Sequence, residues 1–373
     1  GDRVHVQAPR NHFALVEGQA PVVLIAGGIG VTPLVAMAAQ LNQRQTPWVM
    51  YYSARTRARV QDVADRIGYK PNRIAQRLVT GRSGMVGFIA KLNADMTADQ
   101  TFLEILTGLT AALAERDVDL VLSVDQHDDP VTVYERMLER GILDGFILNA
   151  PVPNDPRVAF LQSRGIPFVM HGQSEQVVDY PFYGIDNRAV SRDAVSLLAT
   201  LGHRRIALLN GDIRFSFAID REQGFREAIA EEGLNTPEAF IGHETPSESY
   251  GYTEALAMLS GRRGTKPTAI ICGSTLIAAG VMRAAKDLGL SVPSDLSLIA
   301  HDDALPQFRA VNFDPPLTVT RSPLRDACSP LANHLIDHIS GGDAETLQSQ
   351  IRAELIVRES TGPVPKGGTD PWP

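Results

Sequence analysis

From residue 84 onward, short apolar runs alternate with amphipathic helical patterns, and this alternation constrains the fold more than any other feature. The apolar runs cover residues 85–89, 120–124, 145–148, 167–170, 206–209, 269–271 and 296–300. The helical patterns between them cover residues 102–113, 131–138, 190–201, 223–230, 252–259 and 277–288. Continuously apolar strands separated by helices are typical of a parallel sheet covered on both faces. About a dozen such elements over roughly 270 residues exceed one core, so the sequence predicts an α/β fold with two doubly wound parallel sheets.

The composition is that of a globular protein, with 373 residues, 44% hydrophobic and 21% charged. These values exclude a wholly disordered, collagen-like or disulfide-stapled chain. The net charge of −8 argues against a basic coat for non-specific nucleic-acid binding. The two cysteines, Cys272 and Cys328, cannot form a four-cysteine metal site, and they favour a reduced, cytoplasmic chain. No apolar run reaches the roughly 18 residues of a membrane span, so no membrane partner is expected.

The first 54 residues have a different pattern, and the boundary between the two patterns lies near residues 53–57. An apolar run over residues 22–26 ends in a glycine loop, a helix follows, and a second apolar run covers residues 48–52. This order predicts a small βαβ unit, with Thr32 as helix cap and Pro33 in the first helical turn. Backbone amides at a helix N-terminus favour a phosphate group, and a tight turn left from an incomplete domain is the alternative. The predicted vestigial nucleotide loop consists of Gly27, Gly28, Gly30 and Thr32.

Residues 56–360 resemble the lactose-repressor (LacI) family of transcription regulators. The resemblance is carried, in order, by Gly68-Tyr69-Lys70-Pro71-Asn72, Ile185-Asp186-Asn187, Leu201-Gly202-His203-Arg204-Arg205, Arg221-Glu222-Gln223-Gly224-Phe225, Pro293-Ser294-Asp295-Leu296, His301-Asp302-Asp303 and Val357-Arg358-Glu359-Ser360-Thr361. It implies a periplasmic-binding-protein-like core that holds an effector, commonly a sugar, between two subdomains. We expect the first subdomain at about 84–184 plus 321–340, the second at about 185–320 plus 341–361, and a flexible tail at 362–373.

Ligands of open α/β sheets bind beyond the carboxyl ends of the strands, so the polar residues there are candidates for the effector site. The resemblance implies that Arg221 clamps the ligand and that Asp302 accepts bonds from its hydroxyls. Ser274 stands where the family usually has Asn. The predicted effector-binding residues are Phe102, Asp125, Gln126, His171, Arg221, Ser274 and Asp302. Three alternatives stay open: a structural ion pair between Asp302 and Arg221, a core position for Phe102, and an edge histidine at 171 with its hydrogen bonds satisfied.

The resemblance also implies that residues 55–83 hold the closing helix of a DNA-binding head, at 56–67, and a hinge helix, at 72–79. In the hinge helix Arg73 and Arg77 share one face, and by the resemblance Leu78 matches a residue that wedges into the minor groove. The predicted DNA-binding residues are Lys70, Asn72, Arg73, Gln76, Arg77 and Leu78. The first two helices of the family's DNA-reading head are absent before residue 56. We therefore expect DNA binding to be weakened or lost, and a solvated connector helix is the alternative.

Residues 1–54 resemble the flavin- and nicotinamide-dependent reductases that supply electrons to oxygenases. The resemblance is carried by Pro9-Arg10-Asn11-His12-Phe13 and Ala26-Gly27-Gly28-Ile29-Gly30-Val31-Thr32-Pro33. Only a middle slice of such an enzyme is represented. We expect a non-functional fragment joined to the regulator by fusion or mis-assembly.

The sequence therefore predicts a LacI-type homodimer whose effector, a mono- or oligosaccharide, controls DNA binding from the cleft. We expect no enzymatic activity, catalytic residue, cofactor or metal, and we interpret His127, Asp128 and Asp129 as a solvated turn. The alternative is an NAD(P)H-dependent flavin oxidoreductase. A third interpretation, an exported sugar-binding protein, leaves residues 56–83 unexplained.

Overall fold

The computed structural model describes residues 22–27, 31–53, 82–91, 100–125, 129–261 and 265–365. Contacts divide the chain into two units, Gly1–Ser83 and Gly84–Pro373, and each is described by itself. Within the described ranges, no helix combines the length and the apolar character that crossing a membrane requires.

The first unit contains the predicted βαβ arrangement. Strands β1 (Val22–Gly27) and β2 (Trp48–Ser53) pair in parallel, and helix α1 (Val31–Gln43) connects them. Leu24, Ala38 and Leu41 form their small buried core. The helix begins at Val31, so Thr32 is its second residue rather than its cap.

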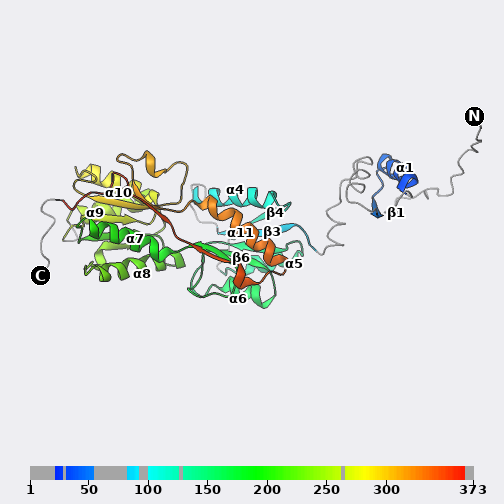
Figure 1. Cartoon of the computed structure of the whole chain (residues 1–373), viewed down its shortest axis with the longest axis horizontal. Helices are drawn as coiled ribbons and strands as arrows, with labels where there is room; N and C mark the ends of the chain where they lie inside the picture. Colours follow the sequence, from blue (N-terminus) through cyan, green and yellow to red (C-terminus); the bar gives the residue numbers. More distant parts are fainter. Residues whose placement is uncertain are drawn as a thin grey trace, which may run out of the picture. The chain divides into compact units, whose positions relative to one another are not determined.

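The second unit contains two six-stranded sheets, which confirms the predicted fold class (Figure 1). The sheet of the first lobe has the order β13-β7-β6-β5-β3-β4, and all its neighbouring strands are parallel. Its strands are β3 (Met85–Lys91), β4 (Asp119–Asp125), β5 (Gly145–Leu148), β6 (Phe168–His171), β7 (Phe182–Ile185) and β13 (Gln348–Ile351).

The sheet of the second lobe has the order β14-β12-β11-β10-β8-β9. Its strands are β8 (Ile206–Asn210), β9 (Ile241–His243), β10 (Ala269–Cys272), β11 (Ser297–Asp302), β12 (Thr318–Arg321) and β14 (Glu354–Ile356). Only β14 runs antiparallel to its neighbour, β12, among the described pairs. Short 3-10 helices η3 (Glu238–Phe240), η4 (Ala310–Asn312) and η5 (Ala344–Leu347) complete the assignment of the second unit.

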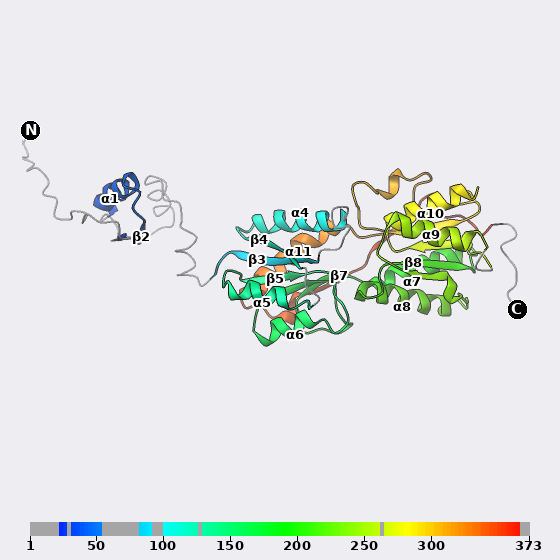
Figure 2. The ribbon, with the colours of Figure 1, turned by 180° about the vertical axis from the view of Figure 1, so that it is seen from behind.

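Successive residues of a strand point to opposite faces of its sheet, so a continuously apolar strand places apolar side chains on both faces. Helices accordingly cover both faces of each sheet. In the first lobe, Ile147 of β5 packs in the cluster with α4 (Gln100–Ala114) and α11 (Leu324–Ile339). Its neighbours Phe146 and Leu148 pack with α5 (Thr132–Glu139) and α6 (Pro156–Ser163) on the other face. Figure 2 shows α5 and α6 on the side of the sheet opposite α4 and α11.

The second lobe is built in the same way. Helices α7 (Asn187–Thr200) and α8 (Ser216–Glu231) cover one face, and α9 (Glu248–Leu259) and α10 (Thr275–Asp287) cover the other (Figure 1). Ile270 of β10 packs toward α9 and α10, and Ile271 packs toward α7 and α8. Both faces of the sheet are therefore closed to water, which explains the continuously apolar strands.

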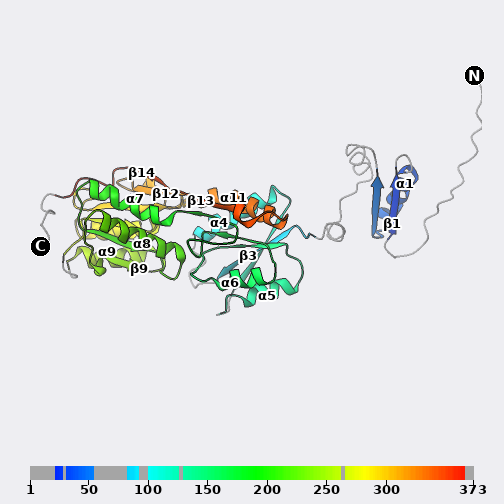
Figure 3. The same cartoon turned by 60° about the horizontal axis from the view of Figure 1, so that its bottom comes forward.

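The described chain passes between the lobes three times, from β7 to α7, from β12 to α11 and from β13 to β14 (Figure 3). After the carboxyl ends of β7 and β12, the chain leaves one lobe and enters the other. Because β6 runs parallel to β7 and β11 runs parallel to β12, the carboxyl edges of both sheets face the junction between the lobes. Residues 344–351 were expected in the second lobe, and this assignment is wrong: β13 hydrogen-bonds to β7 and so belongs to the first.

Candidate functional site

Arg221 lies on α8 in the second lobe, at the carboxyl edge of the sheet. Its side chain is only 7% exposed. Nε donates to Asn187 Oδ1 at 2.9 Å, Nη1 donates to the Gly273 carbonyl at 2.8 Å, and the guanidinium carbon lies 5.3 Å from the centre of the Phe217 ring. Burial lowers the pKa of Arg221 to about 10, against the opposing effect of Asp303. The side chain is therefore charged at neutral pH.

The carboxylate whose charge acts on Arg221 belongs to Asp303. Burial would raise the pKa of Asp303, but His301, Arg221 and His171 outweigh that effect and lower it. Asp302, in contrast, is 4% exposed, accepts a hydrogen bond from the Ala304 amide at 2.8 Å, and lies 3.7 Å from Arg321 Nε. Among the described residues, the ion pair of Asp302 is thus with Arg321 and not with Arg221.

His171 ends β6 in the first lobe and interacts electrostatically with Asp303 of the second. Its Nδ1 lies 3.0 Å from Asn149 Oδ1, so with this orientation of the amide Nδ1 carries the hydrogen and Nε2 is left as an acceptor. Burial lowers the pKa of His171 to about 4, so the ring is neutral at neutral pH. The junction therefore brings together a cation, a carboxylate and a neutral imidazole.

The loop that carries Asn149 is fixed by Arg157. Its Nη1 donates to the Asn149 carbonyl at 3.1 Å and its Nη2 to the Ala150 carbonyl at 3.3 Å. Asp155 holds the guanidinium through Nε at 2.8 Å and also accepts a bond from the Val152 amide at 3.2 Å. The backbone next to His171 is therefore preorganised by a charged network.

Ser216, the first residue of α8, joins the two lobes directly. Its amide donates to the Pro151 carbonyl at 2.9 Å, and its hydroxyl donates to the Ser174 carbonyl at 3.0 Å. Both acceptors belong to the first lobe. We call this pair of bonds the Ser216 contact; it lies one and a half turns before Arg221 on the same helix.

The other predicted effector residues occupy varied positions. Phe102 is half-buried and stacks on Phe88 with ring centres 6.3 Å apart, as in the core alternative. Asp125 ends β4 and is buried. Ser274 caps α10 by accepting a bond from the Ile277 amide at 3.3 Å. Gln126 lies outside the described residues.

Sequence reasoning missed several polar groups at this junction. Asp303, Asn187, Asn149 and Ser216 make the contacts described above, and each lies just after a strand or at the start of a helix. In addition, Asn210 Oδ1 and Thr275 Oγ1 are buried and have no hydrogen-bond partner in the described part of the chain; Asn210 ends β8 and Thr275 begins α10. A position immediately after a strand was the signal that could have found Asn149 and Asp303, and a position at the start of a helix could have found Asn187, Ser216 and Thr275.

Other predicted positions are not described by the structure. The DNA-contacting residues Lys70, Asn72, Arg73, Gln76, Arg77 and Leu78 lie outside the described residues, as do Gly28 and Gly30. Gly27 ends β1. His127 and Asp128 are also outside the described ranges, and within those ranges no three His, Cys, Asp or Glu residues form a metal-binding group.

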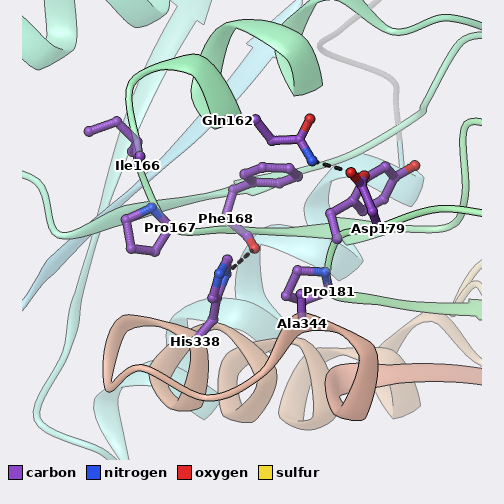
Figure 4. A pocket seen from close by; sticks show the side chains of 10 residues that line it. Gln162, Ile166, Pro167, Phe168, Asp179, Pro181, His338 and Ala344 are labelled. Atoms are coloured by element: carbon purple, nitrogen blue, oxygen red, sulfur yellow. Dashed lines mark hydrogen bonds between the residues drawn. The ribbon is translucent and has the colours of Figure 1, made fainter.

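A cavity of about 470 Å³ lies elsewhere in the first lobe, between α6, the end of α11 and the start of β6 (Figure 4). Its polar groups are bonded within the protein. Gln162 Nε2 donates to Asp179 Oδ1 at 2.9 Å, and His338 Nδ1 lies 3.1 Å from the Phe168 carbonyl (Figure 4). We therefore place the candidate site at the junction of the lobes, where buried polar groups converge, and not in this cavity.

Comparisons with known proteins agree with this architecture. Residues 195–361 match the model of the periplasmic binding protein-like domain. The HTH-type transcriptional regulator AglR of Rhizobium meliloti is 41% identical over 322 residues, which cover 86% of this chain and 90% of AglR.

Two solved structures are also similar. A regulatory protein of the LacI family from Chloroflexus aggregans is 28% identical with a TM-score of 0.64, over 75% of this chain and 99% of that one. The transcriptional regulator CelR in complex with cellobiose is 25% identical with a TM-score of 0.66, over 88% of this chain and 98% of that one.

Proposed function

Because the chain belongs to the LacI family of transcriptional regulators, we propose that it regulates transcription by binding a small sugar between its two lobes. The observation that carries the proposal is the position of Arg221, Asp303 and His171, from both lobes, at the carboxyl edges of the two sheets, where they interact electrostatically. The cellobiose complex of the similar regulator CelR supports a disaccharide as the class of effector.

The chemistry of these groups fits a neutral polyhydroxylated ligand. A guanidinium supplies donors in a fixed plane, and a carboxylate accepts two hydroxyl hydrogen bonds, so together they suit adjacent hydroxyls of a sugar ring. The neutral His171 adds an acceptor from the opposite lobe. Binding, and not catalysis, is the proposed role of these residues.

The proposed mechanism is conformational. An effector that contacts both lobes favours their closed arrangement by its differential affinity, and closure repositions the hinge segments of a homodimer. Lys70, Asn72, Arg73, Gln76, Arg77 and Leu78 remain the proposed DNA-contacting residues. Because a hinge segment alone supplies few phosphate contacts, we propose weak, strongly salt-dependent DNA binding in the cytoplasm.

Titration calorimetry of the full chain against glucose, galactose, maltose, cellobiose, hypoxanthine and an amino-acid mixture tests the sugar assignment. We expect at least one disaccharide to bind. Binding of hypoxanthine or of an amino acid, together with the failure of every sugar, would overturn the proposal.

For residues 1–54 we retain the reductase-like fragment as a proposal. The parallel β1–α1–β2 unit is compatible with it, but the relatives reported above give it no support. Purified protein should show neither a flavin absorbance band nor NADH-dependent dye reduction. Either signal would favour the oxidoreductase alternative.

A further inference from the structure

A sequence motif that the proposed effector site leaves unexplained lies against the motif that supplies Arg221 to the site. The first is Ile185-Asp186-Asn187, at the passage from β7 into α7, and the second begins at Arg221 and includes Gly224. Arg221 Nε donates to Asn187 Oδ1 at 2.9 Å, so the motifs meet at the guanidinium itself.

Gly224 makes this contact possible. A Cβ atom built at position 224 would lie 2.2 Å from the carbonyl oxygen of Arg188, so α8 touches the backbone of the first turn of α7. Residues three apart share one face of a helix, so Arg221 lies on the same side as Gly224. The close approach of the two helices therefore brings the Arg221 side chain to Asn187.

The contacts of Arg221 leave one donor nitrogen available. Asn187 takes the Nε hydrogen, the Gly273 carbonyl takes one from Nη1, and Phe217 packs against the guanidinium. Nη2 has no hydrogen-bond partner within the described part of the chain. Asn187 and Gly273 together fix the plane of the fork and thus the direction of Nη2.

Asn187 is itself fixed at a passage between the lobes. The preceding residue, Asp186, caps α7 by accepting a bond from the Ala189 amide at 2.9 Å. The Asp186 amide donates to the Ile351 carbonyl at 2.8 Å, which ties this passage to the one after β13. The start of α7 therefore connects the guanidinium to two of the three interlobe passages.

We propose that Asn187 is the positioning residue of the effector site: it aims Nη2 of Arg221 at the ligand and joins that arginine to the passage between the lobes. The proposal rests on the proposed function, because the ligand is the effector. It gives the Ile-Asp-Asn motif a role distinct from helix capping, which Asp186 performs.

The first experiment needs no effector. In ¹⁵N-labelled full-length protein, the Nε–H resonance of Arg221 is identified by its loss in Arg221→Met. We expect Asn187→Ala to shift this resonance and to speed its exchange with water, whereas Gln223→Ala should leave it unchanged. Gln223 is the matched control, because it bonds Arg188 across the same helix pair without contacting Arg221. An unchanged resonance in Asn187→Ala would overturn the proposal.

The second experiment measures affinity for the disaccharide that the wild-type protein binds best. Asn187→Ala should weaken binding about tenfold, the effect of losing a hydrogen bond to a charged group. Adding Asn187→Ala to Arg221→Met should cause no further loss, because the residue acts through the arginine. Multiplicative losses would assign Asn187 a merely structural role and contradict the proposal. If the wild-type protein binds no sugar while the resonance shifts, the proposed function fails and the positioning role stands.

Discussion

At the scale of single residues, the junction holds a buried cation, Arg221, that has no carboxylate at ion-pair distance in the described part of the chain. Among the described residues, the contacts of Arg221 are two neutral oxygens and an aromatic ring, and Asp303 acts on it by its charge. A buried charge is costly unless other groups compensate for it. We therefore expect the charge of Asp303 to stabilise the ligand-free protein.

We predict that Asp303→Asn lowers the free energy of unfolding by about 1–3 kcal/mol near neutral pH, because Arg221 loses its compensating charge. Urea unfolding measures the change. Asp287→Asn serves as the control, because Asp287 is exposed and bonds only to the Tyr252 hydroxyl within the described chain. Equal losses in both variants would show that the Asp303 charge has no special role.

Buried histidines predict how stability depends on pH. Burial lowers the pKa of His171 from 6.5 to about 4, and it also lowers the pKa values of His203 and His301. A histidine with a lowered pKa binds fewer protons when folded than when unfolded. The contribution of the neutral, buried His171 to the free energy of unfolding is fully present above pH 6.5 and is lost as the pH falls from 6.5 toward 4.

We therefore expect the urea midpoint of the ligand-free protein to fall over this pH range, and the fall to be smaller in His171→Gln. Circular dichroism at each pH gives the midpoints. The same pH slope in the wild-type protein and in His171→Gln would contradict a neutral, buried imidazole at this position.

At the scale of elements, glycines allow pairs of helices to touch. Where α9 crosses α10, a Cβ atom at Gly251 would lie 2.1 Å from the Ile277 carbonyl, and one at Gly280 would lie 2.1 Å from the Glu248 carbonyl. Backbone cannot move aside as a side chain can. In the α7–α8 pair, Gly224 likewise allows the backbones of the two helices to touch.

We predict that Gly280→Ala destabilises the protein by about 1–3 kcal/mol through overpacking, although alanine is the better helix former. Gly108→Ala on α4 is the matched comparison, because its new methyl group would meet the Cys328 side chain at 2.5 Å instead of backbone. Thermal unfolding should show the larger loss for Gly280→Ala. A larger loss for Gly108→Ala would contradict the backbone-contact argument.

The sequence predicted the continuously apolar strands well and the polar ones poorly. The seven apolar runs correspond to β3, β4, β5, β6, β8, β10 and β11. Strands β13 and β14 have four and three residues, and β13 has the polar sequence QSQI, so no periodicity reveals them. Helix α11 has Pro330 in its interior, which normally argues against a helix, yet its apolar face packs against α4.

The site was predictable only in part, for a related reason. His171 and Arg221 follow from strand ends and from the family motif. The choice between Asp302 and Asp303 depends on the course of the chain after β11, where Ala304 has a φ of 58° and Asp302 turns back to bond its amide. No pattern in the sequence fixes such a turn.

At the scale of the whole molecule, the Ser216 contact reports whether the lobes are closed. Its amide bonds to the opposite lobe, so hydrogen exchange at this position depends on their separation. We predict that the effector slows exchange in peptides covering residues 211–221 more than in peptides from β8 of the same lobe. Mass spectrometry measures both. Equal protection of the two regions would argue against closure.

We also predict that Ser216→Ala weakens effector binding about three- to tenfold, because it removes one of the two bonds of the Ser216 contact. Ser216→Thr keeps a hydroxyl and should restore most of the affinity. Calorimetry with the best-bound disaccharide distinguishes the variants. Unchanged affinity in Ser216→Ala would show that closure does not depend on this contact.

The late position of β13 and β14 in the chain has a consequence for biosynthesis. Until the ribosome has translated residues 348–356, β7 and β12 are both unprotected sheet edges, and unpaired edges invite association with other chains. Neither half of the core can finish folding while the nascent polypeptide is shorter than this. A premature stop codon before residue 348 should thus produce an aggregating product instead of an isolated, soluble first lobe.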